Sequence, residues 1–350
     1  MSSTSSNIQL CYQCGKCTAI CPVRRVVMTT PRSNIYQTNV YRKSSDDIWN
    51  CLTCGLCYDG CPQGVDYPEF VKEDREGKQQ GDLVHKGVFT LLSDLMADLK
   101  ESKTSLAESG NNDSKIGYYP GCLDFHDMFF DLDVDFKSIA DSSMKLLEKM
   151  DMSAQMLQLK CCGHDQLWQG DTETFNKLKE QNTELIIKSG IETLVTSCAE
   201  CYRTLSMDYD LPCEVVHISQ LLKNADLGID SDISVTCHDA CRLGRHMGEY
   251  DAPRESLESA GATVTEMAHS KNESWCCGVS TMMNCNDKSK ALRKARLDEA
   301  KDTKAKVLIT SCPKCLAHLN CMKTEQESIE NYEFDIKDLT VFLAEQLGGK

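Results

Sequence analysis

Two pairs of adjacent cysteines constrain this chain more than any other feature of its sequence. Cys161 and Cys162 stand in QLKCCGHD, and Cys276 and Cys277 stand in SWCCGVS. The Cα atoms of neighbouring residues are about 3.8 Å apart, whereas a relaxed disulfide requires roughly 4.4–6.8 Å. Because a bond within either pair would be strained, the pairs predict thiolates that act side by side at a common centre.

The composition limits the setting in which these cysteines act. The chain has 350 residues, 22 cysteines and a formal net charge of −15. It carries no apolar leader and no run of 18 apolar residues, so we expect a cytoplasmic protein with reduced thiols and no membrane span of its own. The acidic balance argues against a nucleic-acid partner, which requires clustered Lys and Arg. Metal ligation or redox chemistry is therefore expected.

Two further cysteine runs lie near the N-terminus, CYQCGKCTAICP (11–22) and CLTCGLCYDGCP (51–62). Both follow the C-x2-C-x2-C-x3-C-P run of bacterial two-cluster ferredoxins, in which the fourth cysteine ligates the other cluster. We predict two cubane [4Fe–4S] centres, the first on Cys11, Cys14, Cys17 and Cys61, the second on Cys51, Cys54, Cys57 and Cys21. Zinc is the alternative for C-x2-C pairs, but a zinc site normally uses two pairs separated by a spacer.

From residue 116 onward the chain repeats itself. The doublets lie 115 positions apart, and the pairs Cys198–Cys201 and Cys312–Cys315 lie 114 positions apart. Short apolar runs predict buried strands, and longer patterned segments at 176–190 and 291–305 predict helices; the runs are 115–119, 155–159, 193–197, 232–236 and 306–310. Cysteines follow these strands, where open α/β sheets place ligand sites. The sequence thus predicts two duplicated α/β units with five cysteines each.

The repeated five-cysteine pattern resembles the CCG-domain family. The matching positions are Cys122, Cys161, Cys162, Cys198 and Cys201, and then Cys241, Cys276, Cys277, Cys312 and Cys315. With a ferredoxin-like domain in front, the chain is similar to the D-type subunit of heterodisulfide reductase, the fused form that combines the B-type and C-type subunits. The resemblance implies that each set holds a non-cubane [4Fe–4S] cluster. It also implies that these clusters reduce or form the disulfide of coenzyme M and coenzyme B, with electrons relayed by the cubane clusters.

The predicted organisation has four segments. An α-helical two-cluster ferredoxin-like domain spans 1–75, a helical connector spans 76–115, and the two CCG domains span 116–230 and 231–350. The connector predicts an amphipathic helix packed against a neighbouring domain, formed by Val84, Val88, Leu91, Leu92, Leu95, Met96 and Leu99. Residues 108–115, ESGNNDSK, predict a flexible joint.

One ligand assignment is open, because Cys237 lies 115 positions after Cys122 and competes with Cys241. The run HDACRLGR, which contains Cys241, matches the sequence motif of the family. This match favours Cys241 as the ligand. Four cysteines then remain, and we expect them to be buried small apolar residues; they are Cys213, Cys237, Cys285 and Cys321.

Several polar residues lie beside the proposed ligands. His164 and His238 are expected to make structural hydrogen bonds, with proton donation to a leaving thiolate as the alternative. Arg242 and Arg245 are expected in surface salt bridges, with an anionic substrate as the alternative, and Trp275 in packing. No nucleotide-binding glycine motif is present. We therefore expect electrons from a soluble flavoprotein or a membrane cytochrome, and the second partner would hold this cytoplasmic chain at the inner face of a membrane.

The sequence favours an iron–sulfur enzyme that reduces, or forms, a low-molecular-weight disulfide. Two alternatives remain: the iron–sulfur subunit of a quinone-linked lactate, glycolate or glycerol-3-phosphate oxidoreductase, and a non-catalytic electron-transfer subunit of a larger complex. A zinc-dependent scaffold is a remote third.

Overall fold

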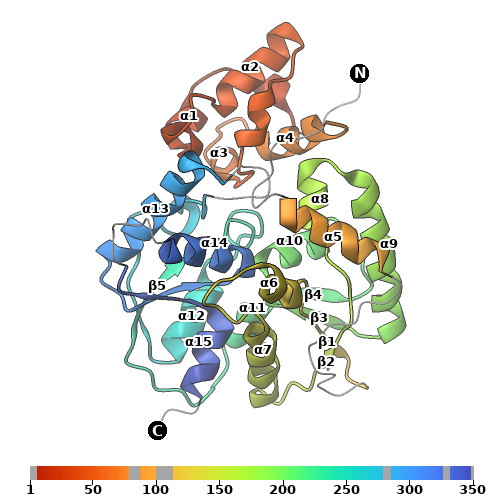
Figure 1. The fold of residues 1–350 in the computed structure, drawn as a ribbon, viewed down its shortest axis with the longest axis vertical. Helices are drawn as coiled ribbons and strands as arrows, with labels where there is room; N and C mark the ends of the chain where they lie inside the picture. Colours follow the sequence, from red (N-terminus) through yellow and green to blue (C-terminus); the bar gives the residue numbers. More distant parts are fainter. Residues whose placement is uncertain (1–5, 79–86, 100–112, 279–284, 326–331, 348–350) are drawn as a thin grey trace.

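The structure, a computed structural model, describes residues 6–78, 87–99, 113–278, 285–325 and 332–347. A small helical part lies at one end, above two α/β halves (Figure 1). This part consists of η1 (Ile8–Leu10), α1 (Lys16–Ile20), η2 (Pro22–Arg25), α2 (Pro31–Tyr41), η3 (Asp46–Asn50), α3 (Leu56–Asp59) and α4 (Tyr67–Arg75).

The first α/β half contains a four-stranded parallel sheet in the order β2-β1-β3-β4. Its strands are β1 (Ile116–Tyr119), β2 (Gln155–Met156), β3 (Thr193–Thr196) and β4 (Glu214–His217). Its helices are α6 (Leu123–Phe129), α7 (Lys137–Lys149), α8 (His164–Gln169), α9 (Thr172–Ser189), α10 (Ala199–Met207) and α11 (Ile218–Leu222).

The second half repeats this plan, with a parallel sheet in the order β6-β5-β7-β8. Its strands are β5 (Ser234–His238), β6 (Thr263–Val264), β7 (Val307–Thr310) and β8 (Asp335–Asp338). Its helices are α12 (Asp251–Ser259), η5 (Lys271–Glu273), α13 (Asp287–Asp302), α14 (Pro313–Thr324) and α15 (Leu339–Gln346). The matching strand orders confirm the predicted α/β class and its duplication. The residue boundaries predicted for the four segments are not tested by these sheets and remain a prediction.

Three strands were missing from the sequence prediction, β4, β6 and β8. β6 has only two residues, and β8 reads DIKD, with charged residues on either side of one buried isoleucine. All three lie at sheet edges, where a strand needs fewer apolar side chains than a central strand. Their short and partly polar sequences therefore lack the apolar run that identified the central strands.

The connector forms α5 (Val88–Asp98), which packs on α8 and α9 (Figure 1). Leu92 and Met96 are buried in a cluster with Cys161. The expected apolar stripe is only partly used, because Leu91, Leu95 and Leu99 are 51%, 45% and 46% exposed. Val84 and residues 108–112 of the predicted joint lie outside the described residues.

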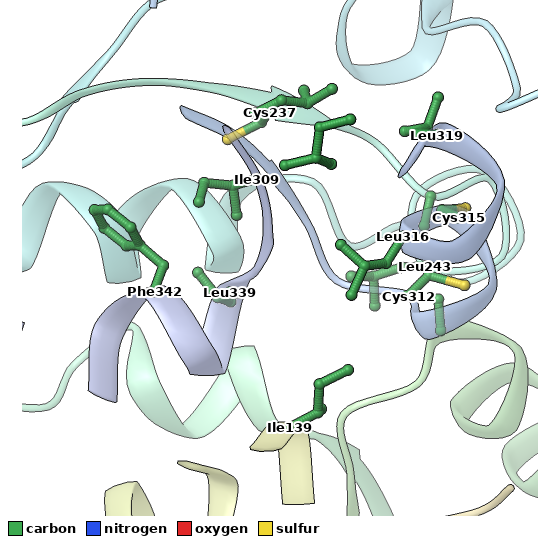
Figure 2. Packing of buried hydrophobic residues seen from close by; sticks show 14 of the residues in the cluster. Ile139, Cys237, Leu243, Ile309, Cys312, Cys315, Leu316, Leu319, Leu339 and Phe342 are labelled. Carbon is green, nitrogen blue, oxygen red and sulfur yellow. The ribbon is translucent and has the colours of Figure 1, made fainter. Parts of the chain in front are cut away.

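The two halves share one hydrophobic core. Helix α15, near the C-terminus, packs against α7 of the first half, and Ile139 lies below Leu339 and Phe342 in Figure 2. The Thr340 hydroxyl donates to the Ile139 carbonyl at 3.3 Å. The halves are thus held by apolar packing as well as by the polar contacts described below. Among the described residues, no helix combines the length and apolar character that crossing a membrane requires.

A glycine follows each cysteine doublet for a steric reason. Gly163 and Gly278 have φ values of +76° and +84°, a region that L side chains rarely occupy. A Cβ on Gly163 would lie 2.8 Å from the Phe175 ring, and one on Gly278 would lie 2.6 Å from Leu292 Cβ. The glycine lets the chain turn sharply after the doublet while α9 or α13 packs directly against it.

Gly163→Ala is expected to destabilise the protein more than Gly190→Ala. Both glycines have positive φ, but an added Cβ at Gly190 meets nothing within 4 Å. A left-handed alanine costs roughly 1–2 kcal/mol, and overpacking against Phe175 adds about 1–3 kcal/mol. Anaerobic urea unfolding of the two variants measures the difference, and equal losses would contradict the packing argument.

Candidate metal centres

Two adjacent pockets in the helical part are lined by the eight predicted cysteines, and each pocket contains one complete predicted set of four. Cys11, Cys14, Cys17 and Cys61 line the first pocket. Cys21, Cys51, Cys54 and Cys57 line the second. In both cases the fourth cysteine of one run reaches the pocket of the other run. Cys57 and Tyr67 border both pockets, so the two sites are direct neighbours.

The two loops reach this arrangement through the same backbone conformation. Gln13 and Thr53 have positive φ, and Gly15 and Gly55, both at +83°, precede α1 and α3. These left-handed residues wrap the chain around its pocket. The Thr53 amide donates to Cys51 Sγ at 3.3 Å, and such donation favours thiolate over thiol. Four soft sulfur donors suit an iron–sulfur centre or zinc better than a hard cation.

The structure also brings together each of the five-cysteine sets. In the first, Cys162 contacts Cys161 and Cys201, Cys201 contacts Cys198, and Cys122 lines the same pocket. In the second, contacts run from Cys241 through Cys276, Cys277 and Cys315 to Cys312. The two sulfurs of the second doublet lie 4.0 Å apart. Five sulfur donors linked by successive contacts again fit a metal–sulfur centre.

Strand register separates Cys237 from Cys241. Cys237 pairs with Ile309 inside β5, as Tyr118 pairs with Val195 inside β1. Cys237 is therefore a buried strand residue, whereas Cys241 lies in the following loop and contacts Cys276. The other three remaining cysteines are only partly buried, contrary to expectation; they are Cys213, Cys285 and Cys321. Arg293 donates to Cys285 Sγ at 3.2 Å.

The two five-cysteine sets meet at the C-x-x-C turns that begin α10 and α14. The Cys198 and Cys312 side chains lie near each other across the junction. Glu200 and Lys314 occupy equivalent positions within the two turns, and their charged groups lie 2.7 Å apart. Lys314 also pairs with Asp165 at 2.5 Å. Burial opposes the charge of Lys314, but the two carboxylates raise the pKa of its ammonium group well above the usual value.

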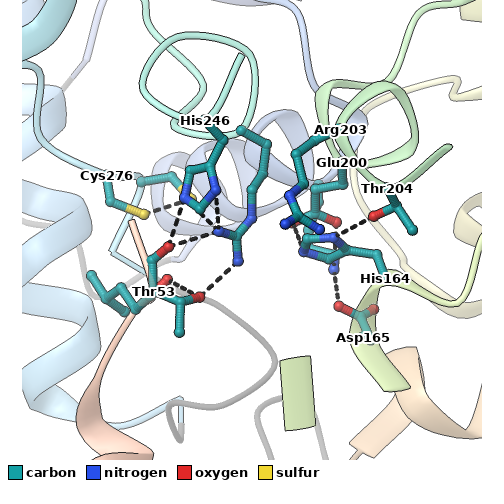
Figure 3. Close-up of polar contacts among 12 residues, drawn as sticks. Thr53, His164, Asp165, Glu200, Arg203, Thr204, His246 and Cys276 are labelled. Carbon is teal, nitrogen blue, oxygen red and sulfur yellow. Dashed lines mark hydrogen bonds and ion pairs between the residues drawn. The ribbon is translucent and has the colours of Figure 1, made fainter. Parts of the chain in front are cut away.

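Arg242 and Arg245 do not form the surface salt bridges expected from the sequence. Both join the helical part to the second half, at the place where Figure 3 shows Thr53 of the helical part beside His246 of the second half. Arg242 is buried and donates to the Thr53 carbonyl and hydroxyl, each at 2.7 Å. Arg245 donates to the Cys54 carbonyl at 2.6 Å. The left-handed turn at Thr53 directs backbone carbonyls outward, and these arginines satisfy them, so the surface salt-bridge prediction was wrong.

The neighbouring aromatic side chains mainly organise the loops. His164 lies 3.1 Å from the Thr204 hydroxyl and 3.5 Å from Glu200, and burial lowers its pKa well below the usual value. His238 accepts a hydrogen bond from Arg296 at 3.0 Å. Trp275 stacks on His269 with ring centroids 4.0 Å apart, in line with the packing expected for it.

Sequence reasoning missed the charged residues of the first five-cysteine pocket. Asp165, Glu200, His126 and Lys314 line it together with the first set of cysteines. Burial lowers the pKa of His126 to about 4. The opposite charges inside CAEC and CPKC were a usable signal, but their pairing depends on how the halves face each other.

Family comparisons agree with this arrangement. The cysteine-rich CCG domain matches residues 116–206 and 235–320, and the 4Fe-4S dicluster domain matches residues 10–65. The chain belongs to the CCG family. This CCG chain is 26% identical to the D-type subunit of the dihydromethanophenazine:CoB–CoM heterodisulfide reductase of Methanosarcina barkeri, over 97% of this chain and 94% of that one. The predicted resemblance to this type of reductase subunit and the iron–sulfur character are confirmed.

Two other similarities extend the comparison of this CCG chain. It is 24% identical to an EtfAB:quinone oxidoreductase of Syntrophomonas wolfei, over 84% of this chain and 46% of that protein. A hypothetical protein of Helicobacter pylori has a similar fold, with a TM-score of 0.54 and 13% identity. The similarity covers 91% of the CCG chain and 64% of the Helicobacter chain.

Lys314→Met is expected to destabilise the protein by about 3–5 kcal/mol, because it leaves two buried carboxylates without their cation. Lys337→Met is the matched control, since Lys337 pairs with Glu345 at an exposed position and a surface pair contributes only about 0–1 kcal/mol. Anaerobic chemical unfolding measures both. A small loss in Lys314→Met would show that the buried ion group is not a stabilising junction.

Proposed function

We propose that this chain is an iron–sulfur oxidoreductase that carries electrons through four cysteine sites to a small disulfide. The observation that carries the proposal is the unbroken series of contacts between the sites. The two N-terminal pockets share Cys57. Arg242 and Arg245 hold the Thr53–Cys54 loop to the second half, beside Cys241. Contact between Cys198 and Cys312 then joins the two five-cysteine sets.

The proposed ligand sets are those of the four sites. Two cubane [4Fe–4S] clusters would be held in the N-terminal pockets, and two non-cubane [4Fe–4S] clusters by the five-cysteine sets. When bound, iron–sulfur clusters supply one-electron transfer, with potentials set by burial and by hydrogen bonds to sulfur. The fit rests on the donors: in each site the cysteine sulfurs converge, and backbone amides donate to sulfur at Cys51, Cys61 and Cys161.

The pocket of the first five-cysteine set supports a small-molecule site. His126, Glu200 and Lys314 line it beside the cysteines, so polar groups and sulfur face one space. Phe89, from α5, lies over this region, with Lys314 Nζ 4.8 Å from its ring centre and His126 at 5.8 Å between ring centroids. The connector helix thus packs against two residues of the pocket lining.

A disulfide is the substrate that best matches two linked sites. Its reduction takes two electrons and two protons and yields two thiols, and each product sulfur is then a soft donor suited to a metal–sulfur site. The chain has two complete five-cysteine sets in contact, and its similarity to the D-type heterodisulfide reductase chain covers nearly all of it. We propose the coenzyme M–coenzyme B heterodisulfide, or another low-molecular-weight disulfide, as the substrate, in either direction of flow.

The partner would be a flavoprotein or a membrane cytochrome within a hetero-oligomeric complex, since the Methanosarcina relative is named as one subunit of a reductase. A second candidate function is quinone-linked electron transfer, favoured by the similarity to the EtfAB:quinone oxidoreductase. A protein of that kind would accept electrons at the same sites without acting on a disulfide.

Anaerobic turnover separates these functions. With reduced viologen as donor, the purified iron-loaded protein is expected to reduce the coenzyme M–coenzyme B disulfide or another member of a disulfide panel. Cys161→Ala and Cys276→Ala are expected to lose that activity, because each removes a sulfur donor from a five-cysteine set. Cys213→Ala is the matched control and should retain it. No turnover with any disulfide, at full iron content, would favour the quinone-linked or the non-catalytic alternative.

Arg242→Ala is expected to slow electron arrival at the five-cysteine sites, because it frees the Thr53 loop from the second half. The unsatisfied carbonyl and hydroxyl should also cost about 1–3 kcal/mol of stability. Arg254→Ala is the control, since Arg254 is equally buried but pairs with Asp239 and Glu266. Rapid mixing with dithionite, followed by freeze-quench EPR, measures the rates. Unchanged arrival in Arg242→Ala would contradict this electron path.

A further inference from the structure

The two five-cysteine sites have equivalent sulfur donors but different neighbours. Strand register places Tyr119 and His238 at the same position, because Tyr119 pairs with Thr196 and His238 pairs with Thr310. The C-x-x-C pairs lie 114 positions apart, which makes Thr204 the counterpart of His318. Each imidazole of the second site thus replaces a hydroxyl side chain of the first.

The protonation state of the His238 ring follows from its partner. Arg296 Nε donates to His238 Nδ1 at 3.0 Å. A guanidinium group only donates hydrogen bonds, so Nδ1 carries no proton and the neutral ring carries its proton on Nε2. Arg296 is itself fully buried and held by the His269 carbonyl and by Glu299, each at 2.7 Å. The orientation of His238 is therefore set by a fixed side chain.

The His238 ring lies beside the second sulfur set. His238 is 3% exposed, and within the described part of the chain its Nε2 makes no hydrogen bond. The ring lies within 4.8 Å of the Cys277 and Cys315 sulfurs. His318 approaches the same doublet, with Nδ1 3.8 Å from Cys277 Sγ. Two imidazoles therefore flank Cys277.

The corresponding hydroxyls of the first site are used elsewhere. Tyr119 donates its hydroxyl to the Lys160 carbonyl at 2.6 Å. The Thr204 hydroxyl lies 3.1 Å from His164 Nδ1. Ser93 Oγ lies 3.2 Å from Cys161 Sγ, but this hydroxyl also bonds the Phe89 carbonyl and has only one proton to donate.

The charged residues near the two sites also differ, and the difference favours an added electron at the second site. In the second site, contact with Cys276 and the positive charges of Arg242 and Arg245 lower the pKa of the Cys241 thiol. Among the described residues that line the first pocket, Asp165 and Glu200 are accompanied by one lysine or arginine, Lys314. An added electron places negative charge on the sulfurs of a metal–sulfur centre, and donors and cations stabilise that charge whereas carboxylates oppose it.

We propose that the second five-cysteine site has the higher reduction potential of the two and is reduced first, with His238 as a positioning residue that donates its Nε2–H to the sulfurs of that site. This inference rests on the proposed function, since it takes both sets to hold iron–sulfur clusters. The second site adjoins the Thr53–Cys54 loop, so it would hold the first electron until another arrives. A disulfide that needs two electrons then meets a protein already carrying one.

The test is an anaerobic potentiometric measurement followed by EPR on the iron-loaded full chain. His238→Leu, which cannot donate, is expected to lower the potential of the centre whose signal disappears in Cys276→Ser. His238→Gln, whose amide can replace Nε2–H, is expected to retain most of the original potential. Tyr119→Phe is the matched control in the first half and is expected to leave both potentials unchanged.

Several outcomes would overturn the proposal. If His238→Leu leaves both potentials unchanged at equal iron content, or shifts both alike, the asymmetry does not come from this hydrogen bond. Should that variant fail to fold, pulsed EPR on 15N-histidine-labelled wild-type and His238→Gln proteins decides, because one histidine coupling at the second centre must disappear in His238→Gln while that of His318 remains. Identical histidine couplings in the two proteins refute the inference. Absence of iron in the wild-type protein would instead refute the proposed function itself.

Discussion

The buried contact between the two C-x-x-C turns is the interaction on which the rest of the structure depends. It joins Cys198 to Cys312 and pairs Glu200 with Lys314 where α10 and α14 begin. Duplication supplied two nearly identical turns, and opposite charges at equivalent positions make them complementary instead of repulsive. A buried ion group of this kind is costly unless every charge is paired, so the two halves must meet in one relative position. That position brings the sulfur sets together.

Arg242 and Arg245 hold the helical part against the second half. Left-handed residues wrap the N-terminal cysteine loops around their pockets, and this turns carbonyl groups outward at Thr53 and Cys54. Arg242 and Arg245 satisfy those carbonyls from the loop that carries Cys241. The backbone geometry that collects the cysteines therefore also creates the docking contact. In this way the backbone conformation of the Thr53–Cys54 loop sets how close the second N-terminal pocket lies to Cys241.

Much of the fold and of the cysteine arrangement was predictable, because it depends on local sequence. Central strands such as β3 and β7 are short apolar runs, and the C-x2-C spacings act within a single turn. The edge strands β4, β6 and β8 were missed because they are short or partly polar. Half of the apolar stripe of α5 is exposed, since periodicity shows that a helix has an apolar face but not how much of it a neighbour covers. Arg242 was misjudged because a charged residue in a loop gives no local sign of burial.

The number and grouping of the cysteines, the internal duplication and the family could all be read from the sequence. These follow from residue type and spacing, which act over a few residues or repeat along the chain. The tertiary structure was needed to show that Cys237 lies inside β5 while Cys241 contacts Cys276, that Lys314 of one half enters the pocket of the other, and that Arg296 orients His238. Such contacts join residues far apart in the chain, and they exist only because apolar packing between α7 and α15 and paired buried charges fix the halves against each other.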